Sequence, residues 1–183
     1  MSVYRLDFAL NDYAGLLTVD ENDLDRLGPF DGTPQAETWE PVALRWEPND
    51  SRPVPDATEV AGAPVLGPRA REALGDLLDG RGEWLPVEVG GSEGWHLFNV
   101  TRLSDGLDEE RSELSRFGDG RLRRVEVFEF DPAVLSDETV FKLAQKPRWY
   151  EFATDTLRDR VGEAELTGFK LEDPVWSAPP INR

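Results

Sequence analysis

The sequence predicts an α+β fold, with a mostly antiparallel sheet, about two helices packed on one side, and a loop-rich N-terminal third. Two segments carry apolar residues at helical spacing, at 68–80 and 154–161. Two others, 84–100 and 122–130, are rich in the β-branched and aromatic residues that favour strands. Helices and hairpin strands that follow one another without regular βαβ alternation are typical of this class.

The first third has the weakest pattern. Alternation from Val3 to Phe8 predicts an opening strand, and the apolar residues from Trp39 to Trp46 predict another. Glycines and prolines interrupt the segments between them. We therefore expect an irregular acidic segment over residues 1–64, with two or three strands, and an α+β domain over residues 65–183. Together they are expected to form one compact unit.

A helix is predicted to begin at Pro68, because proline suits the first helical position. Gly80 ends it. Its buried stripe is expected to contain Ala70, Ala73, Leu74, Leu77 and Leu78.

A hairpin follows, in which Trp84–Val89 and Trp95–Val100 are joined by a turn at Gly90–Gly94. The segment from Leu122 to Phe130 predicts a long strand, and one further strand is expected between Phe141 and Phe152, interrupted at Pro147.

The last part of the chain predicts a short helix and a closing strand. Thr154 is expected to cap the helix, which carries Leu157 and Val161. The closing strand is expected near Val175 and Trp176.

The composition argues against several functions. The chain has 183 residues, 37 acidic and 20 basic, with a net charge of −17. Such a charge repels nucleic acids and anionic lipid, so we expect neither as a partner. With no cysteine and a single histidine, we expect no metal site and no cofactor. The opening residues lack a signal-peptide pattern, and we expect a cytoplasmic protein.

Three motifs match functional signatures only in part. Gly90–Gly94 has the letters of a nucleophile elbow, but that elbow requires a helix after the turn, and a strand is predicted here. Asp23–Gly28 begins like a calcium loop, but Pro34 stands where the bidentate glutamate belongs. His96 lies between Trp95 and Leu97 without an identifiable nucleophile or orienting acid. We assign no catalytic residue.

Three local motifs carry a family resemblance: Phe98-Asn99-Val100, the acidic turn from Asp108 to Ser112, and Leu166-Thr167-Gly168-Phe169. With the order of elements over residues 65–176, they resemble a bacterial polymorphic-toxin immunity family, the myxobacterial-type immunity domain, formerly a domain of unknown function. The resemblance implies a cytoplasmic antidote that binds and neutralises a cognate toxin. It transfers no binding residue to this chain.

Acidic clusters are the candidate toxin-binding residues, because many toxins that act on nucleic acids are basic and acidic patches attract basic proteins. Residues 1–66 contain 13 acidic and four basic residues, against 24 and 16 in residues 67–183. The alternative interpretation is that these acids simply lie in solvated loops. The candidates are Asp20, Glu21, Asp23, Asp25 and Asp31 in the first cluster, and Asp105, Asp108, Glu109 and Glu110 in the second.

Two other functions stay open at the level of sequence. A carboxylate-based hydrolase would place two acids with divergent pKa values in a deep cleft. A non-catalytic regulatory or scaffold module would differ from an antidote only in its partner.

Overall fold

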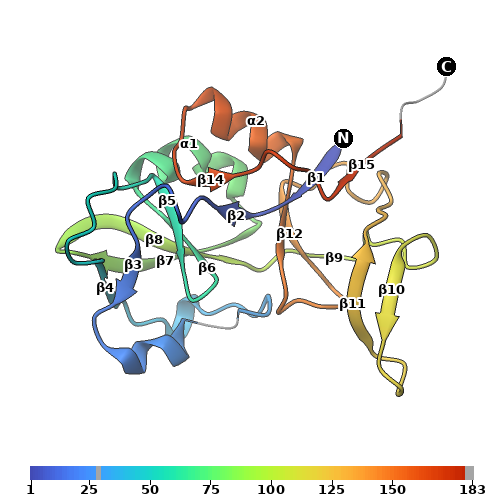
Figure 1. The fold of residues 1–183 in the computed structure, drawn as a ribbon, viewed down its shortest axis with the longest axis horizontal. Coiled ribbons are helices and arrows are strands. Elements are labelled where there is room, and N and C mark those ends of the chain that lie inside the picture. Colours follow the sequence, from blue (N-terminus) through green and yellow to red (C-terminus); the bar gives the residue numbers. More distant parts are fainter. Residues whose placement is uncertain (28–29, 180–183) are drawn as a thin grey trace.

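A computed structural model describes residues 1–27 and 30–179, which form two main sheets and two α-helices (Figure 1). Strands dominate and most pairs are antiparallel, which confirms the predicted α+β class. Residues 1–64 contribute strands to both main sheets.

The larger sheet has six strands in the order β3-β4-β7-β8-β6-β5, all antiparallel except the pair β4 and β7. The outermost strands, β3 and β5, lie close to each other, so the sheet curls around a cluster of buried apolar side chains. Its strands are β3 (Leu16–Thr18), β4 (Val42–Trp46), β5 (Ala57–Val60), β6 (Ala63–Leu66), β7 (Gly82–Val89) and β8 (Ser92–Val100).

The second sheet has five strands in the order β15-β1-β13-β12-β9, with only β12 and β9 parallel. One strand was predicted between Phe141 and Phe152, but β12 and β13 are two strands that pair across a turn containing Pro147. The strands are β1 (Ser2–Arg5), β9 (Leu103–Ser104), β12 (Val140–Leu143), β13 (Glu151–Thr154) and β15 (Trp176–Ser177).

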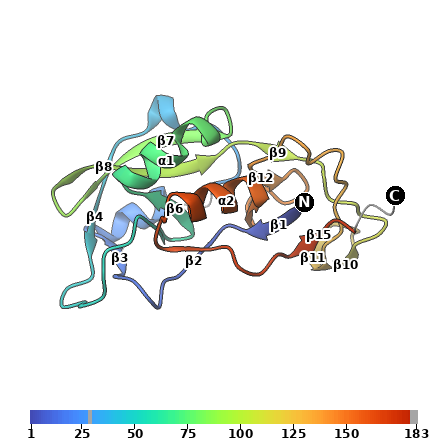
Figure 2. The ribbon, with the colours of Figure 1, turned by 90° about the horizontal axis from the view of Figure 1, so that it is seen from above.

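The helices α1 (Pro68–Leu78) and α2 (Asp155–Glu163) lie side by side on one side of the molecule, as predicted (Figures 1 and 2). The Arg160 guanidinium of α2 donates to the backbone oxygen of Ala73 in α1 at 2.9 Å. Thr154 occupies the N-cap position, but its hydroxyl donates to the backbone oxygen of Glu138 at 2.8 Å. The predicted cap position is therefore confirmed, but the Thr154 hydroxyl makes no capping hydrogen bond to the helix.

The predicted hairpin is confirmed with a tighter turn. Gly90 and Gly91 have φ values of 56° and 79°, and β8 begins directly afterwards at Ser92. Two consecutive residues with positive φ are typical of a two-residue hairpin turn. Because a strand follows the turn, the nucleophile-elbow interpretation is excluded.

Two smaller sheets complete the fold. The pair β2 (Asp7–Phe8) and β14 (Phe169–Lys170) joins the two ends of the chain, and β10 (Glu113–Arg116) pairs with β11 (Leu122–Val127). This second pair forms one end of the molecule, at the right of Figures 1 and 2. It covers an aromatic-rich cluster that includes Phe130, Phe141 and Phe152.

Candidate interaction surface

The structure separates the two predicted acidic clusters. The first lies mainly on η1 (Glu21–Arg26), a short 3₁₀ helix that was not predicted and that lies at the lower left of Figure 1. The second directly precedes β10, at the opposite end of the long axis. The two clusters therefore cannot form one continuous surface.

The carboxylates on η1 are held by local hydrogen bonds. Asp20 caps the helix, and its Oδ1 accepts a hydrogen bond from the backbone N–H of Asn22 at 2.9 Å. Asp23 accepts one from the Arg26 guanidinium at 2.8 Å. Glu21 and Asp25 form no ion pair within the part of the chain that the structure describes. Their charges are free to act on a partner.

Apolar side chains lie exposed beside these acids. Val19, Leu24 and Leu17 are 57%, 47% and 40% exposed. They border a groove of about 370 Å³ between β3, η1 and the turn from β5 to β6, which Arg45 of β4 also lines. An exposed apolar patch with a polar rim is typical of a protein-binding site. We call this region the β3–η1 surface and define it by Leu17, Val19, Asp20, Glu21, Asp23, Leu24 and Asp25.

Sequence analysis had identified the acids of the β3–η1 surface but missed its apolar residues. The signal was present in part, because Val19 directly precedes Asp20 and Leu24 lies between Asp23 and Asp25. Nothing in that pattern alone distinguishes an apolar residue that packs inward from one that faces solvent.

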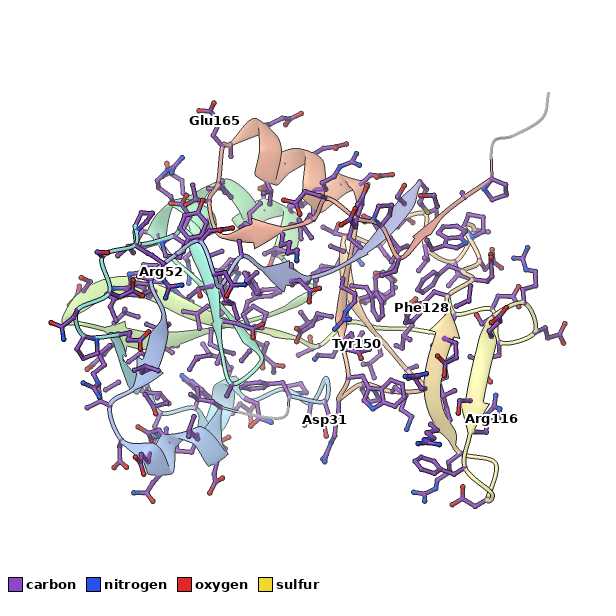
Figure 3. All side chains as sticks on the ribbon, in the orientation of Figure 1. Asp31, Arg52, Arg116, Phe128, Tyr150 and Glu165 are labelled. Carbon is purple, nitrogen blue, oxygen red and sulfur yellow. The ribbon has the colours of Figure 1, made fainter. Side chains whose placement is uncertain are left out.

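Asp31 lies apart from η1, low and near the centre of Figure 3. Hydrogen bonds from Thr33 lower its pKa, and the guanidinium of Arg148, 3.2 Å away, adds to this effect. Asp31 therefore stays ionised and connects the first third of the chain to the segment between β12 and β13.

In the second cluster, arginines compensate much of the charge. Asp108 accepts a hydrogen bond from Arg111 at 2.6 Å, which lowers its pKa, and Glu109 pairs with Arg116 at 2.5 Å. Asp108 also accepts hydrogen bonds from the backbone N–H groups of Glu110 and Arg111. It thus stabilises a turn, while Asp105 and Glu110 remain exposed.

Two possible catalytic arrangements lack the required partners. Glu151 has a pKa raised by burial and lines a cavity, but its hydrogen-bond partner is the Lys142 ammonium at 2.7 Å rather than a second carboxyl. The His96 ring contacts the backbone oxygen of Gly94 at 3.1 Å, and its pKa is lowered chiefly by burial. Neither arrangement resembles the paired groups of a hydrolase.

Within residues 1–27 and 30–179, no group of three His, Asp or Glu side chains is arranged to hold a metal ion. In the same part of the chain, no helix has the length and apolar character needed to span a membrane.

Comparison with known families gives one match. The model of the Immunity protein family (Imm11) matches residues 15–175, a range that includes the six-stranded sheet and both helices. No curated protein matches the chain.

Proposed function

Since the chain belongs to the Immunity protein family (Imm11), it is an antidote that neutralises a cognate toxin, and we propose that it binds this toxin through the β3–η1 surface. We further propose that the toxin is a basic protein of a polymorphic toxin system, and that the complex forms in the cytoplasm. On this proposal the protein acts by binding alone and not as an enzyme.

The composition of the β3–η1 surface carries the proposal. Exposed Val19 and Leu24 provide apolar area, which gives affinity when it is buried against a partner. The carboxylates of Glu21 and Asp25 lie on the same short helix and favour a partner with lysine or arginine at its contact face. The second acidic cluster offers less free charge, because Asp108 and Glu109 are paired with arginines.

A co-expression experiment tests the proposal. The toxin encoded beside this gene would be produced with the unaltered chain or with the double variant Glu21→Lys/Asp25→Lys. Neither side chain forms an ion pair in the described structure, so the fold should be retained. We expect the variant to bind the toxin at least about tenfold more weakly, a loss of about 1.4 kcal/mol, and to protect growth poorly.

The matched control is Asp105→Lys/Glu110→Lys, which makes the same change of net charge at the other end of the molecule. We expect this variant to protect growth as the unaltered chain does. Equal protection by both double variants would contradict the proposed surface. Failure of the unaltered chain to bind or protect would contradict the proposed function.

A further inference from the structure

A groove of about 440 Å³ lies beside the turn of the hairpin formed by β7 and β8. We call it the hairpin groove. It is lined by Pro41, which directly precedes β4, by residues 86–88 of β7, and by residues 91–96, which belong to the turn and to the start of β8. Its volume falls within the usual range of ligand sites, about 300–1,000 Å³. The hairpin groove is therefore large enough for a side chain of a partner.

The fold leaves this part of the hairpin uncovered. Leu85 and Val87 of β7 are buried inside the curled sheet. Because side chains alternate along a strand, Trp84, Pro86 and Glu88 lie on its other face. Trp84 packs against the apolar cluster to which α1 contributes, but Pro86 and Glu88 are exposed. The helix thus leaves the hairpin groove open.

The charges that line the hairpin groove are negative. Glu88 and Glu93 are exposed, and neither forms an ion pair within the part of the chain that the structure describes. The described lining includes no lysine or arginine. His96 is neutral at pH 7, because burial, followed by the charge of Arg71, lowers its pKa. Arg71 itself does not line the groove, and its guanidinium lies over the ring of Trp84, 5.0 Å from the centroid.

Two contacts hold the hairpin groove in shape. Nε1 of Trp39 donates to the backbone oxygen of Pro86 at 2.9 Å, which fixes the segment before Pro41 against β7. The ring of Trp95 is only 8% exposed and packs edge-on against Trp46, with 5.4 Å between the centroids. A site that is shaped before binding loses little conformational entropy when a partner enters it.

The hairpin groove lies at the same end of the molecule as the β3–η1 surface. The turn between β7 and β8 is at the far left of Figure 1 and η1 is at the lower left, whereas β10 and β11 are at the right. The strand β4 connects the two regions, because it pairs with β3 on one side and with β7 on the other. A partner that covers this end of the molecule would therefore meet both regions.

These observations favour a cationic side chain as the occupant. Carboxylates attract lysine and arginine, and the apolar stems of these side chains cover apolar surface while their charged heads stay in water. We propose that the hairpin groove receives a lysine or arginine side chain of the toxin, whose charged head lies at the carboxylates of Glu88 and Glu93. Its stem lies against Pro41 and Pro86. This inference rests on the proposed function, since it assigns a second contact to the same partner.

Nuclear magnetic resonance can test the hairpin groove without any toxin. The chain contains a single histidine, so the ring ¹H–¹³C signal of His96 needs no assignment in a protein made without a histidine tag. This signal would be followed during titration with the Nα-acetylated amides of diarginine, dilysine and dicitrulline, at a pH where His96 is neutral. Citrulline has the shape of arginine without its charge.

We expect a saturable shift of the His96 signal with at least one of the two cationic amides, and binding at least about fivefold tighter than that of the dicitrulline amide. A smaller difference in affinity, or no saturable shift with either cationic amide, would overturn the inference.

A double variant identifies the groups that bind. Glu88→Gln/Glu93→Gln removes both charges of the groove, and the fold should be retained because both side chains are exposed. The matched control Asp105→Asn/Glu110→Gln removes two charges at the opposite end of the molecule. We expect the groove variant to bind the cationic amide at least about fivefold more weakly than the control does. A smaller difference would contradict a role for Glu88 and Glu93.

The outcomes for the hairpin groove and for the function are separable. The comparison of the three amides uses the unaltered chain, so it tests the groove even if the double variant does not fold. Failure of the titration removes the second contact and leaves the co-expression result standing. Failure of co-expression removes the function and leaves the titration result standing.

Discussion

The buried side chain of Asn99 holds the loop before β4 in place through hydrogen bonds. Its Nδ2 donates to the backbone oxygen of Thr33 and to Oε2 of Glu83, both at 3.0 Å. Glu83 in turn accepts hydrogen bonds from the backbone N–H groups of Gln35 and Ala36. The loop before β4 is thereby attached to β7 and β8.

We expect Asn99→Ala to reduce the free energy of unfolding by about 1–3 kcal/mol, because it removes two hydrogen bonds, one of them to the charged carboxylate of Glu83. Urea denaturation would measure the change. The exposed Asn11→Ala serves as the control and should have little effect. A change in Asn99→Ala as small as that of the control would show that the loop does not depend on this amide.

Gly168 occupies a position that admits no side chain. Its φ is 95°, and an added Cβ would lie 1.9 Å from the backbone oxygen of Ala57. We expect Gly168→Ala to destabilise the fold by more than about 2 kcal/mol, since the strain of a positive φ adds to this clash. Thermal unfolding would measure it.

The variant Gly91→Ala separates the strain of a positive φ from the clash of an added Cβ. Gly91 also has a positive φ, of 79°, but nothing lies within 4 Å of an added Cβ. We expect this variant to lose only about 1 kcal/mol. Equal losses in Gly91→Ala and Gly168→Ala would mean that the contact with Ala57 is not decisive.

Glu59 gives a prediction with a defined dependence on pH. Burial, followed by the charges of Asp7 and Glu151, raises its pKa above the ordinary value of 4.5. The unfolded chain therefore releases this proton at lower pH than the folded chain does. Protonated Glu59 therefore contributes its full share of stability below its ordinary pKa. This share is lost as the pH rises through the pKa that Glu59 has in the folded protein.

We therefore expect Glu59→Gln to raise the free energy of unfolding at pH 7. The gain over the unaltered chain should disappear as the pH falls through the ordinary glutamate range. Urea denaturation at several pH values would measure it, with exposed Glu88→Gln as the control. If the gain in the free energy of unfolding of Glu59→Gln does not depend on pH, the raised pKa of Glu59 is not its cause.

At the level of elements, the sequence predicted best those segments whose pattern is local. Pro68 and the apolar stripe that includes Leu74 set the limits of α1, and Gly90 with Gly91 set the turn between β7 and β8. Each depends on backbone preferences within a few residues. These features need no distant partner, so the sequence alone contains them.

The elements that were missed depend on distant partners. The strand β9 is two residues long and exists because Leu103 and Ser104 pair with Lys142 and Leu143. The pairing of β1 with β13 likewise joins the two ends of the chain. Such short segments have too few residues for a periodic pattern, and their register is fixed only by tertiary contacts.

The candidate site was predicted only in part, because some of its features also depend on residues that are distant in the sequence. The carboxylates of Glu21 and Asp25 were recognisable as a charged cluster, but the exposure of Val19 and Leu24 depends on what the folded chain packs against them. A cavity of about 230 Å³ between the two main sheets brings Phe30 next to Lys142, 112 residues later. No local pattern encodes that proximity.

At the scale of the whole molecule, the net charge of −17 is unevenly compensated. At the β10–β11 end, Arg111, Arg116 and Arg124 each pair with a neighbouring carboxylate. At the β3–η1 end, Glu21 and Asp25 form no ion pair within the described residues. The uncompensated charge of η1 thus lies next to the exposed apolar patch.

This distribution predicts how salt acts on toxin binding. If the acids of the β3–η1 surface attract a basic toxin, raising the salt concentration from about 0.05 M to 0.5 M should lower the association rate constant at least about tenfold. Screening shortens the range of the attraction. The dissociation rate should change much less, because it depends mainly on contacts already formed. Stopped-flow kinetics would measure both rates.

The two lysine double variants distinguish local attraction from the effect of net charge. Glu21→Lys/Asp25→Lys and Asp105→Lys/Glu110→Lys change the total charge equally, but only the first alters the proposed contact face. We expect the first to flatten the salt dependence of the association rate and the second to leave most of it. Because the Debye length is about 10 Å at 0.1 M salt, charges at the far end of the molecule contribute little. Equal flattening by both variants would mean that net charge alone guides the encounter and that the β3–η1 surface has no special role in it.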